Sequence, residues 1–238
     1  MNKTPLSKTL AMLLPTLSLF GCGGDGDSNV SVNPGSDAVF EVRIINLTHN
    51  QPLSPPGVIL HRSGYSAFAA GNPVSVELEV LAEGGDPADW IAQAEANNAV
   101  LATAADTAPV GPGGSTTLSI TGNRSADLAI SLATMLVNTN DAFTGRSGIA
   151  VGQLAVQESL RLNLPAYDAG TEANSETAAT IPGPAAGGEG FNAIRDDHDF
   201  VSIHAGVVTS DDGLNTSALD ESHRFIGPTA QVVITRIQ

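Results

Sequence analysis

Short stretches of alternating apolar and polar residues are the feature that most constrains the fold of this chain. Residues 39–47 follow this pattern and predict a strand that enters a core. Between such stretches, the 25 glycines and 14 prolines among the 238 residues indicate many turns. The sequence therefore predicts an all-β protein built as a two-sheet antiparallel β-sandwich of about eight strands. The further predicted strands cover residues 58–61, 74–81, 115–120, 128–137, 200–204 and 231–237.

One short helix is predicted in this β-rich chain, from residue 87 to about residue 97. Asp86 can cap its start, and Pro87 suits the first helical position because proline has no backbone N–H to satisfy there. Trp90 and Ala94 fall on one face of such a helix. We expect this helix to cover an edge of the sandwich.

Two segments rich in Ala, Gly and Pro, residues 102–114 and 177–190, are predicted to be long surface loops. The sequence has no repeat of fixed period and no linker between two separate cores. Residues 37–238 are therefore expected to form a single domain.

The charge balance excludes several classes of function. Acidic residues number 25 and basic residues 10, which gives a formal net charge of −15. Because a polyanion would be repelled, nucleic-acid binding is excluded and a cation is the more natural ligand. The lone cysteine, Cys22, rules out an intramolecular disulfide and a multi-thiolate metal site.

The N-terminal segment predicts export. Residues 1–21 combine two lysines with an apolar run and a final glycine, as in a secretory signal peptide. Residues 19–22, Leu-Phe-Gly-Cys, resemble a bacterial lipobox, which implies that Cys22 is acylated and anchors the protein to the membrane. Gly23 follows where an Asp would retain the protein at the inner membrane, so the outer membrane of the cell envelope is expected. Residues 22–36 then form a flexible tether. The alternative is an ordinary signal peptide with a coincidental cysteine.

Two carboxylates four residues apart mark the most informative segment. Gly170 lies between Asp168 and Glu172 and allows a sharp turn, so the two side chains can converge. Asp141 follows directly on the predicted strand 128–137, which offers a rigid platform for a third carboxylate. Hard oxygen ligands of this kind suit Ca²⁺. The alternative is that Asp168 only caps a turn and that Glu172 is solvated.

The sequence resembles the spondin domain, the N-terminal module of F-spondin and mindin, in three places. The first is the strand from Phe40 with the proline-rich residues 52–56 and His61. The second is residues 81–86, Leu-Ala-Glu-Gly-Gly-Asp. The most specific is residues 167–172, Tyr-Asp-Ala-Gly-Thr-Glu, where the family has Tyr-Asp-Ala-Gly-Thr-Asp. The similarity is concentrated between residues 38 and 182.

This resemblance implies an eight-stranded antiparallel sandwich of C2-like type that holds one calcium ion through three acidic side chains. By motif, these acids fall on Asp168, Glu172 and Asp141. Glu172 is one methylene longer than the family's Asp, residues 138–143 lack the family's prolines and tryptophan, and the family's disulfide cysteines are missing. The resemblance further implies a non-enzymatic adhesion or matrix-recognition module with a protein or glycan ligand.

Two other kinds of site are compatible with the sequence. His198 and His204, with Asp196, Asp197 and Asp199, have the residue types of a transition-metal site, although a polar turn followed by a strand histidine explains them as well. The second is an envelope hydrolase acting on polysaccharide or ester substrates. No Gly-x-Ser-x-Gly motif occurs, and one Trp and two Tyr offer few platforms for sugar rings.

Overall fold

The structure, a computed structural model, describes Met1 and residues 36–238. Apart from Met1 and Ser36, the predicted signal peptide (1–21), the predicted lipidation site Cys22 and the predicted tether (22–36) lie outside these residues. Within the described part of the chain, no helix is both long and apolar enough to cross a membrane.

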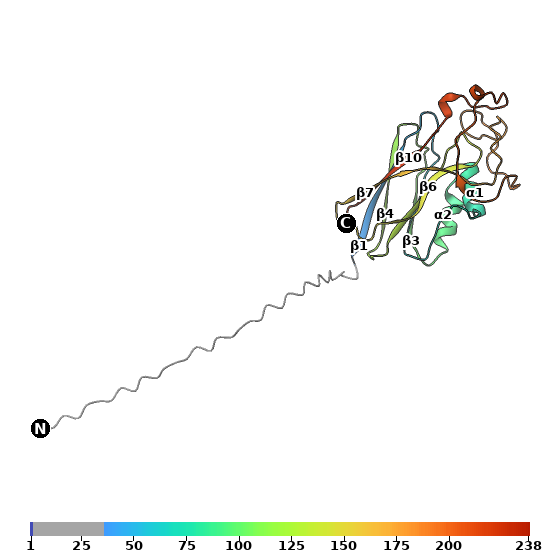
Figure 1. Ribbon diagram of the computed structural model, residues 1–238. Helices are drawn as coiled ribbons and strands as arrows, with labels where there is room; N and C mark the ends of the chain where they lie inside the picture. Colours follow the sequence, from blue (N-terminus) through green and yellow to red (C-terminus); the bar gives the residue numbers. More distant parts are fainter. Residues whose placement is uncertain (2–35) are drawn as a thin grey trace. The chain divides into compact units, whose positions relative to one another are not determined.

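The described residues form ten strands in two antiparallel sheets, which confirms the predicted all-β sandwich (Figure 1). The smaller sheet has the strand order β4-β1-β10-β7. The larger sheet has the order β3-β2-β5-β6-β8-β9. The strands of the smaller sheet are β1 (Asp37–Asn46), β4 (Ser115–Asn123), β7 (Ser159–Leu164) and β10 (Ala230–Arg236). Those of the larger sheet are β2 (Gly57–His61), β3 (Val100–Ala105), β5 (Ala129–Met135), β6 (Ala142–Ala150), β8 (Ala166–Asp168) and β9 (Ser202–Ile203).

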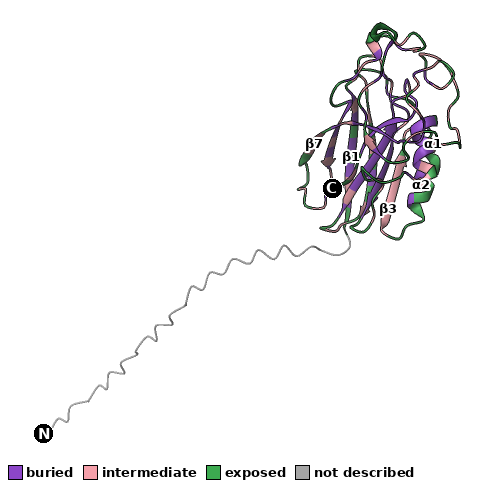
Figure 2. Cartoon of the chain, turned by 45° about the vertical axis from the view of Figure 1, so that its right-hand side comes forward, coloured by how far each residue is buried: buried purple, intermediate pink, exposed green. Residues whose placement is uncertain are grey.

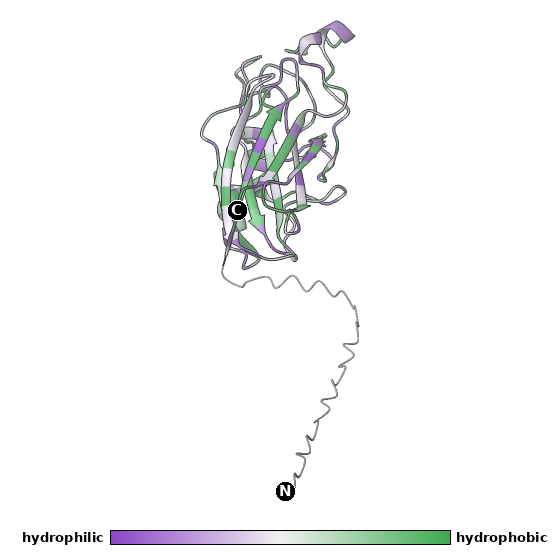
Figure 3. Ribbon diagram, turned by 90° about the vertical axis from the view of Figure 1, so that its left-hand side faces the viewer, coloured by the Kyte–Doolittle hydropathy of each residue, from purple (hydrophilic) through white to green (hydrophobic). Residues whose placement is uncertain are grey.

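The alternating pattern of residues 39–47 is the core-facing pattern of β1. Phe40, Val42 and Ile44 are fully buried, whereas the residues between them are exposed or partly exposed. Because side chains alternate across a strand, one face of β1 lies in the core between the sheets. Val232 and Ile234 of β10 face the same core. Figure 3 shows the hydrophobic residues of this core in green along the strands.

A second core lies on the outer face of the larger sheet, under two helices. All five residues of β2 are buried, because this strand is covered on both faces. Ile59 packs in a cluster with Leu78 of α1 (Val76–Gly84) and Trp90 of α2 (Ala88–Glu95). Figure 2 shows the buried sides of both helices in purple against the sheet. The sandwich is therefore three layers deep on this side.

The predicted helix at residues 87–97 is confirmed as α2. The helix begins one residue later than predicted, with Pro87 rather than Asp86 at the N-cap, although the Asp86 carboxylate accepts a hydrogen bond from the backbone N–H of Ala88 at 2.9 Å. Trp90 and Ala94 are fully buried on the face toward the sheet.

The strand predicted at residues 74–81 is wrong, because most of this segment lies in α1. The alternation of Val, Glu and Leu here is short and also fits a helix, in which Leu78 and Leu81 share one buried face. The Ser75 hydroxyl caps the helix by accepting from the N–H of Leu78, and Gly85 ends it in the left-handed conformation with φ 76°.

Four strands were not predicted, and one of them includes part of a predicted loop. Residues 102–105, expected in a surface loop, belong to β3, which pairs with β2 at the edge of the larger sheet. In β6, glycines at positions 145 and 148 interrupt the apolar pattern. Gly145 is required there, because a side chain would collide with the backbone carbonyl of Leu132 in β5. The unpredicted strands are β3, β6, β7 and β8.

Candidate metal centre

The pairing of β6 with β8 brings two of the predicted calcium ligands together. Asp168 is the last residue of β8 and pairs with Ala142, the first residue of β6, so Asp141 precedes its strand directly beside Asp168. After Asp168 the chain turns sharply at Gly170, whose φ is +75°. The turn required by the sequence prediction is therefore present.

Asp141 is fully buried and holds the turn that carries the other two acids. Its Oδ2 atom accepts hydrogen bonds from the backbone N–H of Thr171 at 2.8 Å and of Glu172 at 3.2 Å. Its Oδ1 atom is buried and has no hydrogen-bond partner among the described residues. One carboxylate oxygen thus orders the turn, while the other is left bare.

Asp168 and Glu172 differ in how their oxygen atoms are satisfied. Asp168 accepts from the N–H of Gly170 and from the side-chain amide of Asn174, both at 2.7 Å, so it does cap a turn. The alternative in which Glu172 is merely solvated is wrong, because this residue is 7% exposed. Its Oε2 atom is buried, again without a partner in the described part of the chain.

The buried carboxylates of this centre resist ionisation. Burial, together with the negative charge of Asp168, raises the pKa of Asp141 to about 7. Burial, with repulsion from Glu83 and Asp141, raises the pKa of Glu172 to about 7. A bound cation would remove this penalty, because it would offset the repulsion among the acids.

Arg195 and Glu83 complete the surroundings of the centre, and neither was predicted from the sequence. The guanidinium of Arg195 pairs with Glu79 of α1 at 2.5 Å and also with Asp199. Glu83, at the end of α1, accepts from the N–H of Asn192 at 2.8 Å, and burial raises its pKa. The position of Glu83 within the run Leu-Ala-Glu-Gly-Gly-Asp, which resembles the spondin domain, was the one available signal.

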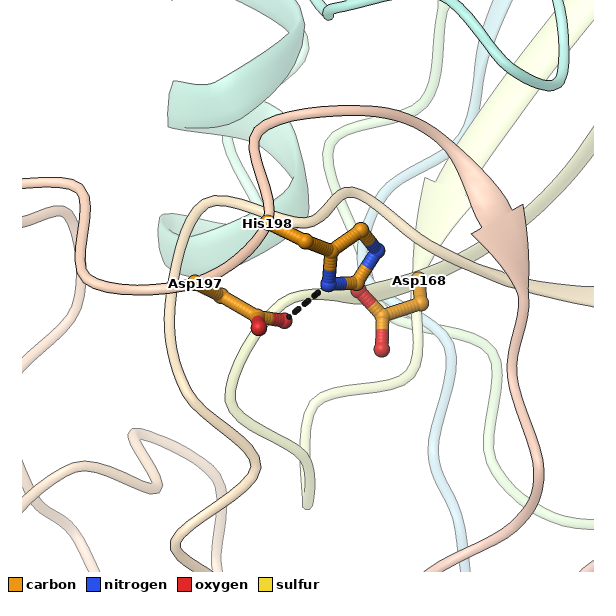
Figure 4. Close-up of side chains that lie close together, drawn as sticks. All are labelled: Asp168, Asp197 and His198. Carbon is orange, nitrogen blue, oxygen red and sulfur yellow. Dashed lines mark ion pairs between the residues drawn. The ribbon is translucent and has the colours of Figure 1, made fainter.

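A second group of ligand types overlaps the first at Asp168. In the described residues, one group of three His, Cys, Asp or Glu side chains has its ligand atoms within 4.8 Å of one another, and it consists of Asp168, Asp197 and His198 (Figure 4). Asp141 and Glu172 are not in this group, so the three predicted calcium ligands do not all approach one another as closely.

His204, which the sequence suggested as a second histidine ligand beside His198, is not part of this group. The buried ring of His204 instead has Nε2 at 3.1 Å from the Asn174 side-chain oxygen, and its Nδ1 accepts from the N–H of Gly206. His198 has its Nδ1 atom 2.8 Å from Oδ2 of Asp197. The structure therefore brings His198 to Asp168 and Asp197, and His204 to Asn174.

The turn at Gly170 gives a first testable prediction, that Gly170→Ala destabilises the protein by about 2 kcal/mol or more. An alanine at this position would have to adopt the left-handed backbone conformation. Its Cβ atom would lie 2.8 Å from the backbone nitrogen of Phe200. Gly187 has nearly the same φ, 72°, with open space around it, so Gly187→Ala should cost only about 1 kcal/mol. Urea unfolding of both variants measures the difference, and equal midpoints would show that the close packing at Gly170 is unimportant.

Comparison with known proteins adds no relative to this description: no family model matches the sequence, and no curated protein matches it.

Proposed function

We propose that this chain is an exported, lipid-anchored, calcium-binding β-sandwich without enzymatic activity. The observation that carries the proposal is the pair of bare, buried carboxylate oxygens, Oδ1 of Asp141 and Oε2 of Glu172. An ionised carboxylate that is buried without a partner costs several kcal/mol, so two bare oxygen atoms on neighbouring acids in one centre favour a bound cation. Oxygen atoms of carboxylates are the ligands that Ca²⁺ prefers.

The residues fit a calcium ion in both charge and ligand type. Asp141, Asp168 and Glu172 would hold it. The positive charge of the ion would stabilise the ionised forms of Asp141 and Glu172, whose pKa values are raised by burial. Asp168 keeps additional lone pairs on both of its oxygen atoms beyond the hydrogen bonds that it accepts. Because the three side chains are not all within 4.8 Å of one another, binding requires the carboxylates to move closer together.

The role that follows from this site is recognition at the cell envelope. An ion held between Asp141 and the turn at residues 168–172 would order that end of the sandwich and present it to a protein or glycan ligand. The resemblance to spondin domains supports an adhesion or matrix-type function. Acylation of Cys22 would attach the protein to the membrane, with the outer membrane as the expected location. The acidic net charge argues against nucleic acid as a partner.

Calcium calorimetry on the full chain tests the proposal. We expect one calcium ion to bind to the wild type, and Asp141→Asn and Glu172→Gln to weaken binding at least about tenfold, because each removes one negative ligand. Asp89→Asn, which neutralises an exposed aspartate on α2, is the matched control and should bind calcium like the wild type. Equal affinities of Asp141→Asn and Asp89→Asn would refute the site.

A further inference from the structure

We propose a second metal site next to the calcium ligands, in which Asp168 and His198 bind a transition-metal dication such as Zn²⁺ and Asp197 positions the histidine. This goes beyond the proposed function, because calcium binding needs neither His198 nor Asp197. The two sites share Asp168 alone.

The backbone holds His198 over the turn that follows Asp168. Asp196 donates its N–H to the carbonyl of Thr171 at 3.0 Å, and Asp199 donates its N–H to the carbonyl of Gly170 at 2.7 Å. The backbone before and after His198 is thus hydrogen-bonded to the turn. Segments nearly thirty residues apart in the sequence are fixed against each other before any ion binds.

The imidazole of His198 is oriented for metal binding. Its Nδ1 atom is 2.8 Å from Oδ2 of Asp197, which leaves Nε2 as the nitrogen for a ligand. A Cβ built on Gly170 would lie 3.1 Å from Nε2, so this nitrogen lies against the bare α-carbon of the turn. Figure 4 shows the ring over the carboxylate of Asp168, with Asp197 on the Nδ1 side. A ligand atom of the ring lies within 4.8 Å of a carboxylate oxygen of Asp168, and a carboxylate that orients one ring nitrogen leaves the other free to bind an ion, which suits zinc.

Burial and charge at this place favour a cation independently of that geometry. Asp168 beside the ring is 5% exposed, and Asp141, which precedes the strand residue paired with Asp168, is fully buried with a bare Oδ1 atom, so buried negative charge lies close to this place. The side chains of His198 and Asp197 are 33% and 25% exposed, so an ion can enter from solvent. Because an imidazole nitrogen is a poor ligand for calcium and a good one for zinc, the second site should select the transition metal.

Competition of the full chain with a zinc chelator tests the proposal. We expect the wild type to bind Zn²⁺ and His198→Ala to bind it at least about tenfold more weakly. His49→Ala, which removes an exposed histidine elsewhere, is the matched control and should bind zinc like the wild type. Zinc affinity that is equal in His198→Ala and the wild type, or that falls as much in His49→Ala, would overturn the proposal.

The role of Asp197 has its own test within the same experiment. Asp197→Ala should weaken zinc binding by roughly 10–100-fold, as expected for the partner that orients a ligating histidine. Asp197→Asn should recover part of this loss, because its amide oxygen still accepts from Nδ1–H. A variant pair with equal losses would overturn the positioning role of Asp197.

Calcium binding measured on the same proteins separates this proposal from the preceding one. His198→Ala should keep the calcium affinity of the wild type, because calcium does not need the imidazole. If the wild type binds calcium but not zinc, the second site alone is refuted. If it binds zinc but not calcium, only the calcium proposal fails.

Discussion

In calcium-free buffer, the stability advantage of Glu176→Gln over the wild type should grow by about 3 kcal/mol between pH 4 and pH 8. Glu176 is 1% exposed, and only one of its oxygen atoms has a partner, the N–H of Val208 at 3.1 Å. The other, Oε2, is buried without a hydrogen bond to any described residue. Burial therefore raises the pKa of Glu176 from 4.5 to about 7.

The sign of the pH effect follows from which state holds the proton. Between about pH 4.5 and pH 7 the folded protein keeps a proton on Glu176 that the unfolded chain has lost. The free energy of unfolding of the wild type therefore falls as pH rises through this window. Below it, both states are protonated and the penalty is absent. The amide introduced by Glu176→Gln does not titrate, so the variant escapes the loss.

Urea unfolding of wild type and variant across the pH range measures this effect in the presence of a chelator. Glu189→Gln, at an exposed position, is the control and should follow the pH dependence of the wild type. An advantage of Glu176→Gln that is the same at pH 4 and pH 8 would show that the Glu176 carboxylate is not strained by burial.

Calcium should raise the free energy of unfolding by about 2.7 kcal/mol at a concentration roughly 100 times its dissociation constant, because it binds only the folded chain. For a domain of this size, the melting temperature should rise by roughly 5–10 °C. At one fixed calcium concentration, the rise should be larger at pH 8 than at pH 5. Asp141 and Glu172, whose pKa values are both about 7, hold protons at pH 5 that calcium must displace.

Thermal unfolding with calcium and with chelator, at both pH values, measures this linkage. Asp141→Asn should lose about half or more of the calcium-dependent rise. It should nevertheless be at least as stable as the wild type in chelator at pH 8, because it has no buried charge at this position. Asp89→Asn should keep the full rise. Coincident melting curves of the wild type with calcium and with chelator would contradict the proposed role of the ion.

The sequence alone was sufficient for the strands with a clean two-residue period. Residues 39–47 and 231–237 became β1 and β10, because alternation leaves a strand only one way to bury its apolar side chains. Residues 159–164 carry the same alternation, so β7 could have been predicted in the same way. Local pattern was insufficient at residues 74–81, where a short alternation fits a helix equally well and packing of Leu78 against the larger sheet decided for α1.

The residue types of the candidate site were readable from the chain, but their environment was not. The spacing around Gly170 identified Asp168 and Glu172, and the end of a strand pointed to Asp141. Only the pairing of β6 with β8 put Asp141 beside Asp168, and only the fold brought His198 across the turn. Burial, which raises the pKa values and leaves carboxylate oxygens bare, is set by contacts between residues far apart in the sequence. Residue chemistry is local, whereas desolvation and proximity are properties of the folded chain.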